Sequence, residues 1–125
     1  MKTRVALGAL LLSALSLPAL AAAPFEAEID CGGSVNLPAS VPFTLRFESQ
    51  SQQSQVIDLT VQVTTPNGRT ITLREATINL RANQDRAIDL HLNLRDTAPL
   101  GQYQMTLVAT SNDASTFDTC SFNAI

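Results

Sequence analysis

Residues 41–48 read VPFTLRFE, and apolar and polar side chains alternate along the whole stretch. Successive side chains of a β-strand point to opposite faces, so this period of two predicts a strand with one buried and one wet face. The alternation recurs in residues 25–31, 57–64, 71–74, 77–80, 88–95 and 102–107. No segment after residue 21 keeps the 3.6-residue period of an amphipathic helix. The sequence therefore predicts an all-β protein made of half-buried antiparallel strands.

Short segments rich in Gly, Pro, Asn, Asp and Ser separate the predicted strands. The clearest is TPNGR at 65–69, because Asn67-Gly68 accepts the positive φ angles that a tight hairpin requires. This spacing gives seven or eight strands, each with one face to bury. We therefore predict an immunoglobulin-like antiparallel β-sandwich, with a closed barrel as the alternative architecture.

The first 21 residues have the features of an export signal. Lys2 and Arg4 precede an apolar run over residues 5–17, and Ala19 and Ala21 fit an A-x-A cleavage site. We predict a signal peptide at 1–21, removed after Ala21, and one sandwich domain at 22–125. The apolar run is short for a bilayer span and no later segment is a candidate, so we expect no membrane insertion after cleavage. The expected location is periplasmic or secreted.

The chain has two cysteines, Cys31 and Cys120. In an exported protein a disulfide is the default interpretation. The alternatives are two free thiols or a metal site that uses both cysteines, and the sequence offers no further ligands near them for a metal. Cys31 continues the apolar phase of its strand and Cys120 shares the phase of Phe122, so we expect both to be joined and buried. Phe117 has the opposite phase, while Asp118 shares that of Cys120; a β-bulge near Phe117 would reconcile them.

Charge excludes several partner classes. Removing the signal takes away two of the eight basic residues; the remaining six, set against eleven acidic residues, give a net charge of −5. All six are arginines scattered along the chain, so there is no basic patch for nucleic acid or an anionic membrane.

The sequence carries no catalytic signature. His91 is the single histidine and lies on the polar phase of its strand, and no G-x-S-x-G, H-E-x-x-H or Gly-rich phosphate loop is present. We therefore expect no enzyme activity and no cofactor. Glu26, Glu28 and Asp30 share a strand face, and Asp113 and Asp118 flank a loop. Their spacing differs from that of calcium-binding loops, which favours a solvated acidic face over a metal site. The sequence leaves open whether a calcium ion is bound.

Several segments resemble the bacterial immunoglobulin-like domains called NEW3 and CARDB. They are residues 43–47, INLRANQ at 78–84, residues 88–94 and APLGQY at 98–103. The resemblance implies an immunoglobulin-like sandwich that serves as an accessory module. Tyr103 also looks like a tyrosine corner, whose hydroxyl bonds to the backbone just upstream. Met105 stands where antibody domains have a cysteine, so their inter-sheet disulfide is not expected.

The polar loop over 49–55 is a candidate binding site at one end of the sandwich, although a plain flexible connection is the favoured interpretation. Its central residues are Ser51, Gln52, Gln53 and Ser54. We predict an exported, non-enzymatic module that binds a protein or a carbohydrate through loops or a sheet edge. The alternatives are a structural subunit of a surface appendage, in which an edge strand pairs with the next copy, and an inhibitor of an exported hydrolase. The sequence leaves the oligomeric state open.

Overall fold

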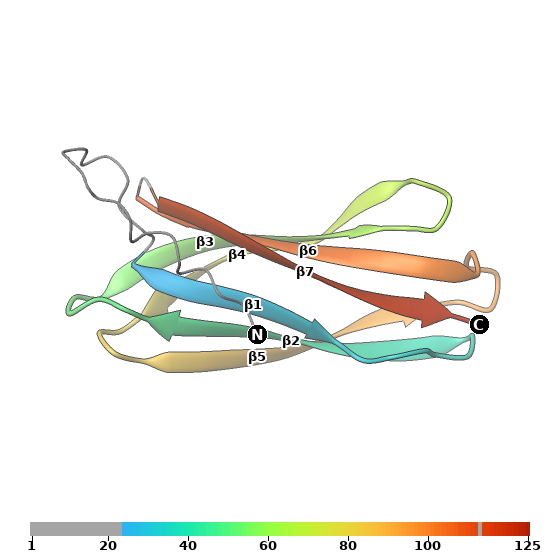
Figure 1. Cartoon of the computed structure of the whole chain (residues 1–125), viewed down its shortest axis with the longest axis horizontal. Helices are drawn as coiled ribbons and strands as arrows, with labels where there is room; N and C mark the ends of the chain where they lie inside the picture. Colours follow the sequence, from blue (N-terminus) through green and yellow to red (C-terminus); the bar gives the residue numbers. More distant parts are fainter. Residues whose placement is uncertain (1–23, 113) are drawn as a thin grey trace, which may run out of the picture.

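A computed structural model describes residues 24–112 and 114–125; the predicted signal peptide and Asp113 lie outside this part. The described residues form seven strands, coloured along the chain in Figure 1. They are β1 (Phe25–Cys31), β2 (Ala39–Ser49), β3 (Gln55–Thr64), β4 (Thr70–Leu80), β5 (Asp85–Leu94), β6 (Gly101–Ser111) and β7 (Ala114–Ala124). Within these residues no helix is long and apolar enough to cross a membrane.

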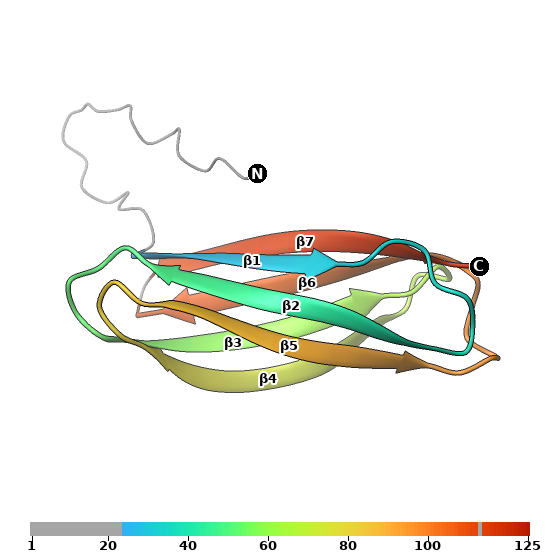
Figure 2. The same ribbon diagram turned by 90° about the horizontal axis from the view of Figure 1, so that it is seen from below.

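The strands form two antiparallel sheets packed face to face (Figure 2). The three-stranded sheet has the order β1-β2-β5, and the four-stranded sheet has the order β4-β3-β6-β7. This arrangement confirms the predicted immunoglobulin-like sandwich and not the barrel, because each sheet keeps two edge strands. The edges are β1 and β5 in one sheet, and β4 and β7 in the other.

The predicted strands near 71–74 and 77–80 are one bulged strand, β4. Its pairing with β3 moves from Val61 opposite Arg74 to Gln62 opposite Thr72, which leaves Leu73 as an extra residue. An extra residue reverses which positions face the core. The apolar pattern therefore changes from odd numbers at Ile71 and Leu73 to even numbers later in the strand.

The bulge predicted near Phe117 is wrong. β7 pairs with β6 without interruption, from Ser111 opposite Ala114 to Gly101 opposite Ala124. Phe117 therefore lies on the outer face, where 67% of it is exposed, and Asp118 points inward. The alternation along β7 is regular, and Asp118 takes an inward position because it accepts a hydrogen bond from the Ile29 N–H.

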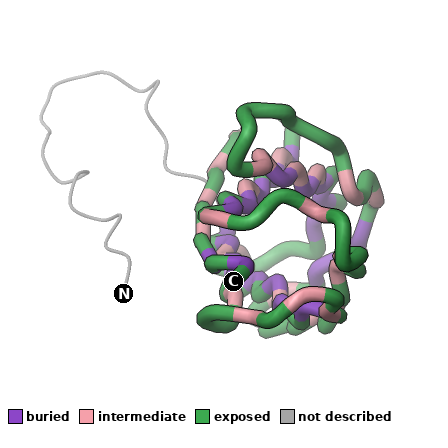
Figure 3. Tube along the Cα trace, turned by 90° about the vertical axis from the view of Figure 1, so that its right-hand side faces the viewer, coloured by how far each residue is buried: buried purple, intermediate pink, exposed green. Residues whose placement is uncertain are grey.

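The core lies between the two sheets, as the buried segments in Figure 3 show. It contains the inward residues of β2, β3 and β6, which include Phe43, Leu45, Ile57, Val61 and Leu107. Each fully buried aliphatic or aromatic side chain contributes roughly 1.5–3 kcal/mol of transfer free energy. The alternation read from the sequence therefore places the core correctly.

The sandwich is closed along one side and open along the other. On the closed side, the edge strands β1 and β7 run next to each other in both views (Figures 1 and 2). On the other side, most inward residues of β4 and β5 are only half-buried, while Ile78 and Leu80 at the end of β4 are buried. The half-buried ones are Leu73, Ala76, Ile88, Leu90, Leu92 and Leu94. We call these two sides the closed seam and the open seam.

Candidate binding face

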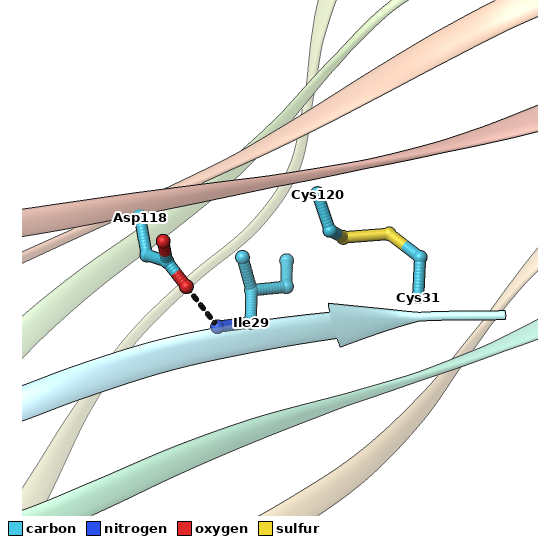
Figure 4. Close-up of a disulfide and its surroundings, with 4 residues drawn as sticks. All are labelled: Ile29, Cys31, Asp118 and Cys120. Carbon is cyan, nitrogen blue, oxygen red and sulfur yellow. Dashed lines mark hydrogen bonds between the residues drawn. A yellow bond between two sulfur atoms is a disulfide. The ribbon is translucent and has the colours of Figure 1, made fainter. Parts of the chain in front are cut away.

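The two cysteines form a disulfide across the closed seam (Figure 4). Cys31 ends β1 in one sheet and Cys120 lies on β7 in the other, with their Cα atoms 5.7 Å apart. Two residues earlier on each strand, the Asp118 carboxylate accepts a 3.0 Å hydrogen bond from the Ile29 N–H. The predicted disulfide is confirmed, but the predicted burial of the two cysteines is wrong, because both are half-buried at the seam.

Tyr103 has the geometry of a tyrosine corner. Its hydroxyl donates a 2.6 Å hydrogen bond to the Pro99 carbonyl, and only 1% of the residue is exposed. Its ring stacks on Phe122, with centroids 5.1 Å apart. Burial raises the pKa of the Tyr103 phenol above its ordinary value, because an ionised phenolate is poorly solvated there. Tyr103 therefore ties the 95–100 connection to the core and is not available at the surface.

The Ser/Gln loop connects β2 to β3 and stays exposed at Gln52, Gln53 and Ser54. Its conformation is set by local bonds, in which the Ser51 N–H donates to the Ser49 hydroxyl and the Gln53 N–H donates to the Ser51 hydroxyl. Such side-chain-to-backbone bonds are typical of short turns. The loop contains no aromatic anchor, and its binding role stays a prediction.

The outer face of the three-stranded sheet is acidic. The register places Glu26, Glu48 and Asp85 in one row, and Asp30, Thr44 and Asp89 in another. Arg46 lies between the rows and contacts Asp30 at 3.6 Å. His91 is exposed on this face opposite Pro42, as its polar phase predicted. Within the described residues, no group of three His, Cys, Asp or Glu is arranged to hold a metal ion.

The outer face of the four-stranded sheet is almost free of charge. Its cross-strand rows are Ser115–Thr110–Asp58–Thr77, Phe117–Val108–Thr60–Glu75, Thr119–Thr106–Gln62–Thr72 and Ser121–Gln104–Thr64–Thr70. Asp58 and Glu75 are the charged members of these described rows, and the Asp58 carboxylate accepts a 2.8 Å bond from Thr77. We call this surface the neutral face.

The neutral face has an apolar centre. Phe117 lies directly opposite Val108, and these residues are 67% and 39% exposed. Hydroxyl and amide side chains occupy the neighbouring rows, about 7 Å away along the strands. An exposed aromatic ring surrounded by neutral hydrogen-bonding groups suits a ligand that is itself uncharged and amphipathic. Sequence analysis missed this site, because the order of strands in the sheet decides which outward residues become neighbours.

A groove of ≈ 340 Å³ opens at one end of the open seam. Leu73 and Ile71 of β4 line it together with Leu92 and Leu94 of β5, while Arg69 and Arg95 also contribute. At the other end, the Arg86 guanidinium donates a 3.2 Å hydrogen bond to the Asn79 carbonyl. The open seam therefore exposes part of the core-facing surface of β5.

Comparison with solved structures identifies the architecture. The CARDB domain of a Pyrococcus furiosus protein, solved in complex with di-metal ions, superposes with a TM-score of 0.65 at 11% identity over 81% of this chain and 87% of that one. The fold is CARDB-like. This confirms the fold expected from the resemblance at residues 43–103, although no protein-family profile and no curated protein sequence matches the chain.

The CARDB-like fold also matches parts of larger enzymes. A family 123 glycoside hydrolase from Clostridium perfringens matches with a TM-score of 0.62 at 10% identity, over 82% of this chain and 27% of that one. An alkylpurine DNA glycosylase from Pseudomonas fluorescens, bound to DNA with an abasic site analogue, matches with 0.64 at 11% identity over 81% and 30%. At such low identity these matches establish the fold alone.

Proposed function

We propose that this CARDB-like domain is an exported, non-catalytic module that binds an uncharged carbohydrate on the neutral face. The observation that carries the proposal is the Phe117–Val108 centre within rows of hydroxyl and amide side chains. A sugar ring has an apolar C–H face that stacks on an aromatic side chain, and a hydroxyl rim that exchanges hydrogen bonds with Thr, Ser, Gln and Asn.

Charge favours a neutral glycan over an anionic one. Asp58 and Glu75 are the charged groups among the described rows of the face, and the acidic face opposite adds to a net negative domain. An anionic polysaccharide or nucleic acid would meet repulsion without a basic partner. The likeness to part of a glycoside hydrolase is consistent with a carbohydrate-linked role.

Affinity electrophoresis of the purified domain 22–125 tests the proposal. Gels containing a neutral glucan, a neutral xylan or anionic polygalacturonate separate the ligand classes. We expect retardation by a neutral polysaccharide and none by polygalacturonate. Phe117→Ala should weaken binding about tenfold, because it removes the stacking platform.

Leu100→Ala is the matched control, because Leu100 is 65% exposed in a loop away from the neutral face. Unchanged binding of Phe117→Ala would exclude the neutral face. Lack of retardation by both neutral polysaccharides would reject the carbohydrate proposal and leave the protein-interaction alternative.

A further inference from the structure

The four edge strands differ in how they are protected from pairing with another chain. Unpaired edges invite strand addition, and natural proteins prevent it with short strands, bulges, inward charges or covalent closure. β1 has seven residues and ends at the disulfide, β7 carries the inward Asp118 and Cys120, and β4 has the bulge at Leu73.

β5 has one of these devices, the inward Arg86 at its start, and none from Ala87 to Leu94. It pairs with β2 at every position without a shift, and it contains no proline, glycine or inward charge between Ala87 and Leu94. Its inward side chains Ile88, Leu90 and Leu92 stay half-buried beside the open seam. The strand therefore offers a regular backbone edge together with apolar surface that is still partly wet.

The sequence of this strand is complementary to itself in antiparallel pairing. When residue numbers of the two copies sum to 180, Leu90 faces Leu90 of the second copy and Ile88 faces Leu92. On the outer face the same register sets Asp89 opposite His91, and each pair occurs twice by symmetry. At the end of the strand, Asp85 faces Arg95 of the second copy. This arginine places a positive charge beside the acidic row of Glu26, Glu48 and Asp85.

The neighbouring register is unfavourable. Faces match only when the two residue numbers have the same parity, so the nearest alternative with long overlap has numbers that sum to 178. That register sets Asp89 directly opposite Asp89, and like charges in this position destabilise a sheet. Repulsion between the two Asp89 side chains thus favours the register centred on Leu90 over this alternative.

We propose that the protein forms a two-fold symmetric dimer in which the β5 edges of two copies pair antiparallel about Leu90. The two three-stranded sheets then join into one continuous sheet of order β1-β2-β5-β5-β2-β1. Pairing satisfies the free backbone groups of β5 and covers the half-exposed leucines at the centre of the interface.

The symmetry of this dimer has a geometric result. A two-fold axis that relates adjacent antiparallel strands is perpendicular to the sheet, so both four-stranded sheets lie on the same side. The two neutral faces consequently point in one direction. The dimer itself rests only on the β5 edge and holds whether or not those faces bind carbohydrate.

Sedimentation velocity of the domain 22–125 over a concentration series tests the dimer. We expect a monomer–dimer equilibrium. His91→Asp creates two Asp–Asp contacts across the axis and should weaken the dimer about tenfold or more. The exchange variant Asp89→His with His91→Asp restores opposite pairs in the same register and should recover the dimer.

Ser40→Asp is the matched control, because it adds the same charge to the same sheet face on the central strand β2. It should leave the dimer intact. Amide hydrogen exchange of the unaltered protein adds a readout without mutation: β5 amides should become more protected as concentration rises, while those of β4 stay unchanged.

A wild-type monomer at all concentrations would overturn the proposal. A dimer insensitive to His91→Asp, or one weakened equally by Ser40→Asp, would place the interface elsewhere and overturn it too. Failure of the exchange variant to recover the dimer in a folded protein would reject the register.

Discussion

The closed seam makes a strong prediction about stability. Cys31 and Cys120 are separated by 89 residues, so their bond closes almost the whole domain into one loop. In the chain-entropy treatment a loop of this length removes about 4.6 kcal/mol of denatured-state freedom at 25 °C. Domains of this size are stable by about 5–15 kcal/mol, so the bond accounts for a large share.

Replacing both cysteines with serine should therefore lower the melting temperature by about 15 °C or more, at 4–8 °C per kcal/mol for a small domain. The measurement is thermal unfolding followed by circular dichroism. Reduced and alkylated wild-type protein serves as the control. Its melting temperature should equal that of the double variant, because both proteins lack only the cross-link.

Amide hydrogen exchange should show which strands lose protection when the disulfide is removed. We expect β1 and β7 to lose protection first, since the bond joins these edges, and β2, β3 and β6 to lose it last, because they are central strands. β5 is also an edge strand and should open earlier than the central ones. A melting temperature lowered by less than about 3 °C would refute the entropic reasoning.

Three further outcomes follow from single contacts. Tyr103→Phe removes the hydrogen bond to the Pro99 carbonyl and should lower the free energy of unfolding by about 1–1.5 kcal/mol, measured by urea unfolding. Because burial raises the folded-state pKa of Tyr103, the free energy of unfolding of the wild type should keep its full value below about pH 10 and fall above it, and the variant should lose this alkaline dependence. Asp118→Ala leaves the Ile29 N–H without its acceptor and should cost about 1–2 kcal/mol, whereas Asp58→Ala, at an exposed site, should cost under about 0.5 kcal/mol; equal losses would contradict the role of the seam. N-terminal sequencing of the exported protein should begin at Ala22, and an intact Met1 in a membrane fraction would contradict cleavage.

The strands and the core followed from the sequence because local alternation determines both. The β4 bulge is visible in hindsight as the change from odd to even apolar positions between Leu73 and Ile78. The inward Asp118 was not predictable, because its partner is a backbone N–H on β1, 89 residues away. A carboxylate in an apolar phase is informative only when the opposite strand is known.

The candidate binding face was not predictable for a similar reason. Phe117 and Val108 are alternate outward residues of their strands, and only the pairing of β6 with β7 makes them neighbours. The segregation of charge has the same origin. The sequence places Glu26, Glu28 and Asp30 on one strand face, but only the order β1-β2-β5 brings Glu48, Asp85 and Asp89 beside them. The sequence contains the side chains, while the order of strands in the sheet determines which of them become neighbours.

The cross-link between β1 and β7 also determines how the domain responds to mechanical tension. The described chain enters at one end of the sandwich and leaves at the other, so a pull between partners attached to its termini loads these two parallel strands (Figure 1). The bond passes that load directly from Cys31 to Cys120. Only about twelve described residues outside the loop can then be drawn out, which adds about 40 Å of extended chain, whereas an uncross-linked domain would release about 300 Å more. The oxidised domain is therefore a nearly inextensible connector, and its reduced form is an extensible one.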